Sequence, residues 1–207
     1  MVDAGLIGGI IIILITAIII AYYQYKGYLS WAGWDPFSAE SSLLISQGDI
    51  SRKWRAKKLE EVNKRQDPNE KVVIGVVGEF GKGMYLCVES ALKKDFTVNM
   101  VSGDSVYDDK IDKLAELVKN YPNTFNYYIV NGRPRHHFLF IGRDNLFIEV
   151  PHEVNQNIKK SIGLNGAKPE IIDKFTKEFA RMLEGAKKAD ESIIRQLKPI
   201  VIKPNTG

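Results

Sequence analysis

The chain has 207 residues, of which 29 are Lys or Arg, 25 are Asp or Glu and one is Cys. This composition excludes a disordered chain, a disulfide framework and a zinc finger. A formal net charge of +4 is also too small to indicate a nucleic-acid partner. The charge is unevenly divided, because residues 1–50 carry −3, residues 51–71 carry +4 and the remainder carries +3. The length predicts one globular domain with an appendage.

The first 25 residues predict a transmembrane anchor. No charged residue lies between Ala4 and Tyr23, a run of 20 residues that is long enough to cross a hydrocarbon core of about 30 Å. Eleven of these residues are Ile or Leu, and tyrosines at the end of the run suit an interfacial aromatic belt. A buried core helix and a cleaved signal peptide are the alternatives. A signal peptide is disfavoured because no basic residue precedes the run and no small-residue cleavage site follows it.

Basic residues indicate the orientation of the span. No Lys or Arg precedes it, whereas Lys26 and the basic cluster that begins at Arg52 follow it. The positive-inside rule therefore places the N-terminus outside and the C-terminal domain in the cytoplasm. We expect a single-pass membrane protein in contact with the lipid bilayer.

Residues 26–70 predict an interfacial linker followed by a basic amphipathic helix. Residues 26–50 show no sustained hydrophobic period, and their aromatic side chains suit the headgroup level or a partner span. Residues 51–65 indicate a helix with Trp54, Leu59 and Val62 on one stripe. Two interpretations of its basic face stay open: it rests on anionic lipid, or it is solvated while the apolar stripe packs on the body.

Residues 71–198 predict an α/β domain, followed by a flexible tail at 199–207. Apolar runs indicate strands at 72–77, 96–101 and 125–130, and a hairpin made of 136–141 and 146–150. Helical patterns occupy 84–94, 110–120, about 153–161, 169–187 and 190–198. This order predicts a mixed sheet flanked by helices, parallel at first and ending in the hairpin.

A glycine-rich loop lies between the first strand and the first helix of this domain. Gly78, Gly81 and Gly83 with Lys82 are placed where phosphate loops occur. The spacing fits neither a P-loop nor a dinucleotide fingerprint, because Val76 stands where the P-loop needs its first glycine. We therefore interpret the loop as a flexible turn with one basic residue.

The three histidines lie within 17 residues of one another, at and just after the predicted hairpin. Strand alternation sends His136 and His137 to opposite faces of the sheet. Three interpretations stay open: a histidine with arginine neighbours binds a phosphate, one His with Glu149 and His152 binds a metal, or the hairpin is polar and solvated. The spacing of Glu149 and His152 across a proline is a weak metal signal, so no metal or other cofactor is expected. The candidate ligand-binding residues are Arg133, Arg135, His136, Arg143, Glu149 and His152.

Residues 71–153 resemble one half of the phospholipase D superfamily. In that fold a strand, helix, strand, helix and strand lead to a strand that carries the motif H-x-K-x4-D. The stretch from His137 to Asp144 has the histidine and the aspartate at the family spacing, but Leu139 occupies the lysine position. The Gly-Ser-x-Asn that often follows the motif is absent.

The resemblance implies a site chemistry with His137 and Asp144 as the catalytic residues. In active members the histidine attacks phosphorus, the lysine binds phosphate oxygens, and a second motif supplies the general acid. One motif copy implies a homodimeric site. Loss of one donor to the phosphoryl oxygens typically lowers a rate by about 10²–10³, so we expect a degenerate domain whose remnant pocket binds an anionic, phosphate-containing group.

Three functions follow from these observations. The first is a binding or scaffold module held at the cytoplasmic membrane face, as a homodimer or docked on other membrane-protein subunits. The second is an active phosphodiesterase of the phospholipase or nuclease type, and the third is an accessory subunit of a membrane complex. Nucleic acid is not expected as a partner.

Overall fold

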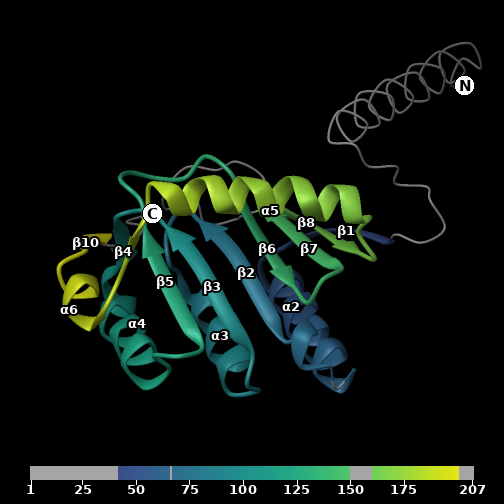
Figure 1. The fold of residues 1–207 in the computed structure, drawn as a ribbon, viewed down its shortest axis with the longest axis horizontal. Helices are drawn as coiled ribbons and strands as arrows, with labels where there is room; N and C mark the ends of the chain where they lie inside the picture. The colour runs from purple at the N-terminus through teal and green to yellow at the C-terminus, as the bar shows by residue number, and fades with distance from the viewer. Residues whose placement is uncertain (1–41, 66, 150–159, 201–207) are drawn as a thin grey trace, which may run out of the picture.

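An eight-stranded mixed sheet organises the chain in the computed structural model, which describes residues 42–65, 67–149 and 160–200 (Figure 1). The predicted span at 4–23 and the end of the tail, 201–207, lie outside the described residues. Within the described ranges, no helix combines the length and the apolar character needed to cross a membrane.

The strand order is β1-β8-β7-β6-β2-β3-β5-β9, with a separate parallel pair formed by β4 and β10. The strands are β1 Ser42–Gln47, β2 Val72–Val77, β3 Thr97–Ser102, β4 Ser105–Tyr107, β5 Phe125–Ile129, β6 His137–Ile141, β7 Asn145–Glu149, β8 Lys160–Asn165, β9 Lys187–Lys188 and β10 Lys198–Ile200. Strands β2, β3 and β5 are parallel, and the other pairs of the large sheet are antiparallel. The predicted mixed sheet and its β6–β7 hairpin are confirmed, but the sheet does not end there, because β8 and β1 continue it beyond β7.

Helices cover both faces of the large sheet (Figure 1). The helices are α2 Gly48–Lys64, α3 Lys82–Leu92, α4 Asp108–Asn120, α5 Pro169–Glu184 and α6 Glu191–Ile194, with a 3₁₀ turn at Pro68–Glu70. Local sequence explains several helix starts. Asp108 and Asp109 place negative charge at the start of α4, Pro169 begins α5, and the Asp190 carboxylate accepts from the Ile193 amide at α6.

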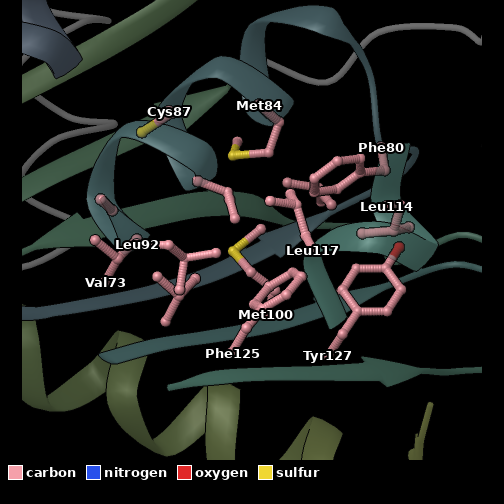
Figure 2. Packing of buried hydrophobic residues seen from close by; sticks show 14 of the residues in the cluster. Val73, Phe80, Met84, Cys87, Leu92, Met100, Leu114, Leu117, Phe125 and Tyr127 are labelled. Carbon is pink, nitrogen blue, oxygen red and sulfur yellow. The ribbon is translucent and has the colours of Figure 1, made fainter. Parts of the chain in front are cut away.

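The larger apolar core lies between the sheet and the layer formed by α2, α3 and α4. Met84, Cys87 and Leu92 of α3 face Met100 of β3 and Phe125 of β5 across this core (Figure 2). The Val-rich sequence of β2 fits its central position, because parallel strands covered on both faces are apolar throughout. A smaller core on the other face packs α5 against the alternate side chains of β6.

Several elements differ from the sequence prediction. The helix expected at 169–187 ends at Glu184, and Lys187 begins the short strand β9, which pairs with β5. Strand β4 was not expected either. Strand β1 occupies part of the predicted linker and pairs with β8, which begins at Lys160 inside the helix expected at 153–161. The helix expected at 190–198 is shorter, because α6 ends at Ile194 and Lys198 begins β10, which pairs with β4. Each of these strands depends on a partner far away in the sequence, and hydrophobic periodicity does not register such pairing.

Candidate functional site

The carboxyl ends of β2, β3 and β5 converge at one edge of the sheet. A Cβ atom built on Gly103 would lie 2.5 Å from the Gly132 carbonyl oxygen and 2.8 Å from that of Gly78. The loops that follow the three parallel strands are therefore packed backbone against backbone. This edge is where open α/β sheets generally bind ligands.

His137 lies at the same edge, because β6 runs antiparallel to β2 and places its first residue beside the end of β2. Its side chain is 5% exposed. Nε2 lies 3.0 Å from the Pro134 carbonyl oxygen, and Nδ1 lies 3.5 Å from Oε2 of Glu149, its cross-strand neighbour on β7. A carbonyl oxygen only accepts, so Nε2 carries a proton and donates it to Pro134. Both ring nitrogens are thus directed at groups of the protein.

A buried ion pair stands next to this histidine. Nε of Arg133 donates to Oε2 of Glu79 over 3.0 Å, and the Glu79 side chain is 2% exposed. Gly78 separates the two features, because a Cβ there would lie 2.5 Å from Arg133 Nε and 2.5 Å from both Cε1 and Nε2 of His137. Glycine is needed at position 78 for the arginine and the histidine to approach the end of β2.

Asp144 lies at the opposite end of β6, in the turn that joins β6 to β7. The four-residue rise from His137 to Ile141 alone spans about 13 Å, so the structure does not bring His137 and Asp144 together. Arg65 forks onto the Asp144 carboxylate with two contacts, of 3.2 and 3.0 Å, and Asn145 donates to it over 2.7 Å. These contacts tie the hairpin turn to the residue that follows α2.

Leu139, at the lysine position of the motif, belongs to the larger core and is fully buried. It shares the His137 face of β6, as strand alternation predicted. Gly75 of β2 gives it room, because a Cβ at that glycine would lie 2.8 Å from Leu139 Cδ1 and 2.7 Å from Met100 Sδ. This position is filled by packing and offers no donor to an anion.

The remaining predicted residues are dispersed. His136 lies on the opposite face from His137, 66% exposed, with Nδ1 3.6 Å from Oε1 of Glu178 on α5. Arg135 and Arg143 are exposed, the latter in the hairpin turn next to Asp144. His152 lies outside the described residues, so the metal set with Glu149 is not tested. Within the ranges that the structure describes, no group of three or more His, Cys, Asp or Glu side chains is arranged to hold a metal ion.

Sequence analysis missed two residues of the site, Gly78 as a packing requirement and Glu79 as the buried partner of Arg133. The phosphate-binding patterns that the loop resembles in position depend on glycines and a lysine, and they give Glu79 no role. A usable signal was present, because Gly78, Gly103 and Arg133 each follow the carboxyl end of a predicted parallel strand. The assembled edge consists of the buried His137 with Glu149 3.5 Å from its ring, and of the partly exposed Arg133 paired with the buried Glu79.

Comparison with known proteins finds similar folds among solved structures but no match to a protein family or to a curated protein. Nuc from Salmonella typhimurium, a phospholipase D family member, superposes with a TM-score of 0.51 at 9% identity, over 73% of this chain and 99% of that chain. Phosphatidylserine synthase from Haemophilus influenzae Rd KW20 gives a TM-score of 0.53 at 8% identity, over 78% of this chain and 42% of that chain.

A third similar structure is TrmBL2, an archaeal chromatin protein described with a novel mode of DNA binding. Its TM-score is 0.50 at 12% identity, and the match covers 88% of this chain and 66% of that one. The chain thus spans less than half of the synthase and about two thirds of TrmBL2. At identities this low, these likenesses show the fold alone. The described residues have a phospholipase D-like fold.

Proposed function

We propose that this chain is a membrane-anchored, cytoplasmic phospholipase D-like domain that has lost catalysis and serves as a binding or scaffold module within a membrane complex. The observation that carries the proposal is the state of His137. Its Nε2 donates to the Pro134 carbonyl, so the lone pair that would attack phosphorus is not presented to a substrate. For His137 to act as a nucleophile, its imidazole ring would have to break its contacts with the Pro134 carbonyl and with Glu149.

The surroundings of His137 support the same conclusion. A transferring phosphoryl group needs positive donors aimed at its oxygens. The motif position that supplies one holds the buried Leu139. Arg133, which approaches Gly78 together with His137, is engaged with the buried Glu79. In this proposal the fold is retained, an apolar side chain replaces the phosphate-binding lysine, and the arginine near His137 is already paired with a carboxylate.

The membrane part of the proposal rests on the sequence. The uncharged run from Ala4 to Tyr23 and the basic residues that follow it favour a single span with this domain on the cytoplasmic side. A domain held in this way works at the membrane surface. Its partners are a second copy of the chain or the subunits of a membrane complex, and the His137 edge is the candidate surface for an anionic group of such a partner.

The test is the size and composition of the full-length protein purified in mild detergent from its native membrane. A homodimer or an assembly with other subunits supports the binding role. The same purification of a His137→Ala variant serves as the comparison: an assembly that is lost in the variant places the partner at the His137 edge, and one that persists places it elsewhere on the domain. A monodisperse monomer in both preparations contradicts the proposal.

A further inference from the structure

Helices α2 and α3 lie side by side on one face of the sheet with their N-terminal ends together. At that end, Cγ and Cδ of Arg52 are each 3.8 Å from a Cβ built on Gly83, and Arg55 Nη2 lies 3.4 Å from the Gly83 carbonyl oxygen. At the other end, Lys94, just after α3, pairs with Glu60 of α2 over 2.8 Å. The two helices therefore run in the same direction.

Positive charge is concentrated at this N-terminal end. Residues 50–59 contain five basic residues and no acidic one. Two of the five are buried: Arg55 lies 4.7 Å above the Phe147 ring, and Lys58 pairs with Glu61 and donates to Asn165. Lys57 is exposed, although its Nζ lies 3.8 Å from Oε1 of Glu61. The exposed members are Arg52, Lys53 and Lys57 of α2, joined by Lys82 at the start of α3.

Apolar side chains stand among these charges. The exposed large hydrophobic residues of the described chain are Ile50, at 56%, and Leu86, at 44%, and they lie on α2 and α3. We call the set Ile50, Arg52, Lys53, Lys57, Lys82 and Leu86 the basic helix surface. Basic side chains with exposed aliphatic groups suit a lipid headgroup layer, which takes both charge and apolar area. Binding to the phosphate backbone of a nucleic acid depends on the basic side chains and gains nothing from the exposed aliphatic ones.

The connection to the predicted span places this surface near the bilayer. Residues 26–41 separate the end of the anchor from β1, and 16 extended residues reach at most about 55 Å. Strand β1 leads directly into α2 (Figure 1), so only the six residues of β1 separate the anchored end of the described chain from the start of α2.

We propose that the basic helix surface docks on an anionic lipid surface, so that the domain lies against the membrane with a fixed face. This inference rests on the proposed membrane anchor. The surface adjoins the His137 edge, because α3 begins at Lys82, shortly after the carboxyl end of β2. Docking therefore also holds that edge close to the bilayer. Neutralising one basic residue near an anionic surface lowers binding about fivefold, so neutralising two lowers it about 25-fold.

The experiment uses the full-length chain in nanodiscs, with a fluorophore on an introduced thiol and a nitroxide quencher on the lipid headgroups. Ala56→Cys places the fluorophore in the basic helix surface, and Ala180→Cys places it at an exposed position of α5, on the opposite face of the sheet. The single native thiol, Cys87, is buried and does not compete for label. Lys53→Gln with Lys57→Gln removes charge, and Lys174→Gln with Lys177→Gln is the matched change on α5.

We expect strong quenching at position 56 and weak quenching at position 180 in discs containing phosphatidylserine. Quenching at position 56 falls in purely zwitterionic discs, in high salt and in the α2 double variant, but persists in the α5 double variant. The proposal is overturned if quenching is equal at the two positions, or if quenching at position 56 is the same in zwitterionic discs as in discs containing phosphatidylserine. Short duplex DNA that binds the lipid-free protein and releases position 56 from the lipid also overturns it, in favour of nucleic acid.

Failure of the anchor is recognised separately, by extraction with alkaline carbonate. A chain that resists extraction but shows no quenching at position 56 keeps the anchor and loses the docking surface. A chain that is extracted has no anchor, and co-sedimentation with phosphatidylserine vesicles then tests the surface directly. Loss of binding in the α2 double variant alone supports it, and equal binding of both double variants contradicts it.

Discussion

Replacement of Gly78 by alanine is the sharpest test of the close packing at the His137 edge. The added Cβ would lie 2.5 Å from Arg133 Nε and 2.5 Å from two ring atoms of His137, whereas ordinary contacts of such atoms exceed about 3.4 Å. Relief requires both side chains to move by about 1 Å. Movement of Arg133 weakens its contact with the buried carboxylate of Glu79, and movement of the ring lengthens its bond to Pro134.

The expected loss of stability combines two effects. Overpacking in a close-packed site costs about 1–3 kcal/mol, and breaking a buried ion pair costs about 3–5 kcal/mol when one charge is left buried. Arg133 is 29% exposed and retains part of its contact by shifting outward, so the sum falls short of the extremes. We expect Gly78→Ala to lower the free energy of unfolding by about 2–4 kcal/mol. For a chain of this size that lowers Tm by roughly 5–12 °C.

The assay is thermal unfolding of the detergent-solubilised chain, followed by a thiol-reactive dye. Burial raises the pKa of the Cys87 thiol, so the folded protein reacts slowly and unfolding gives the signal. Gly185→Ala is the matched control, because a Cβ there meets nothing within 4 Å, and its Tm should change by about 1 °C or less. A parental Tm for Gly78→Ala would refute the packing described for this edge.

Three further changes probe other parts of the account. Asp144→Asn removes the fork to Arg65 and should lower the free energy of unfolding in urea by about 1 kcal/mol; no change would mean that the turn is not tied to the end of α2. Arg181 lowers the pKa of Glu178, so this carboxylate contributes stability above its ordinary pKa that is lost as pH falls through the lowered value. Glu178→Gln should therefore cost under about 1 kcal/mol at pH 7 and progressively less as the pH falls and the carboxylate is protonated, whereas a cost that does not change with pH would contradict an ionic role. Leu139→Lys restores the motif lysine but buries an ammonium group, and should cost more than about 3 kcal/mol by thermal unfolding without producing hydrolysis; a stable, active variant would show that the position opens on the site.

The sequence predicted the central sheet because its strands are continuous apolar runs. The apolar run 72–77 and the turn residues around Gly142 indicate a strand and a hairpin by themselves. Leu59 and Val62 pack on the body, which is one of the two interpretations that the sequence left open. Strands β1 and β8 were not predicted, because each is short and mixed and is stabilised by pairing with the other. Residues that precede β8 are polar and long-chained, a pattern shared with solvated helices.

The site was predicted only in part. Alternation separated His136 from His137, and the motif spacing singled out the latter, but spacing along a strand does not report that Asp144 lies at the other end of β6. The contacts of His137 with Pro134 and Glu149 depend on a loop and a neighbouring strand. The burial of Arg55 and Lys58 could not be predicted either, because it depends on the sheet against which α2 packs, and residues 50–59 of the sequence look basic throughout.

The most direct test of the central claim is hydrolysis of a chromogenic phosphodiester, such as bis(p-nitrophenyl) phosphate, by the full-length protein in mild detergent. Parent and His137→Ala are compared at equal concentration, with assembly size checked in the same samples. We predict no hydrolysis above the detergent blank for either protein, because Nε2 of His137 donates to Pro134 and Leu139 offers no phosphate donor. Hydrolysis by the parent that disappears in His137→Ala would contradict the account and make this chain an enzyme.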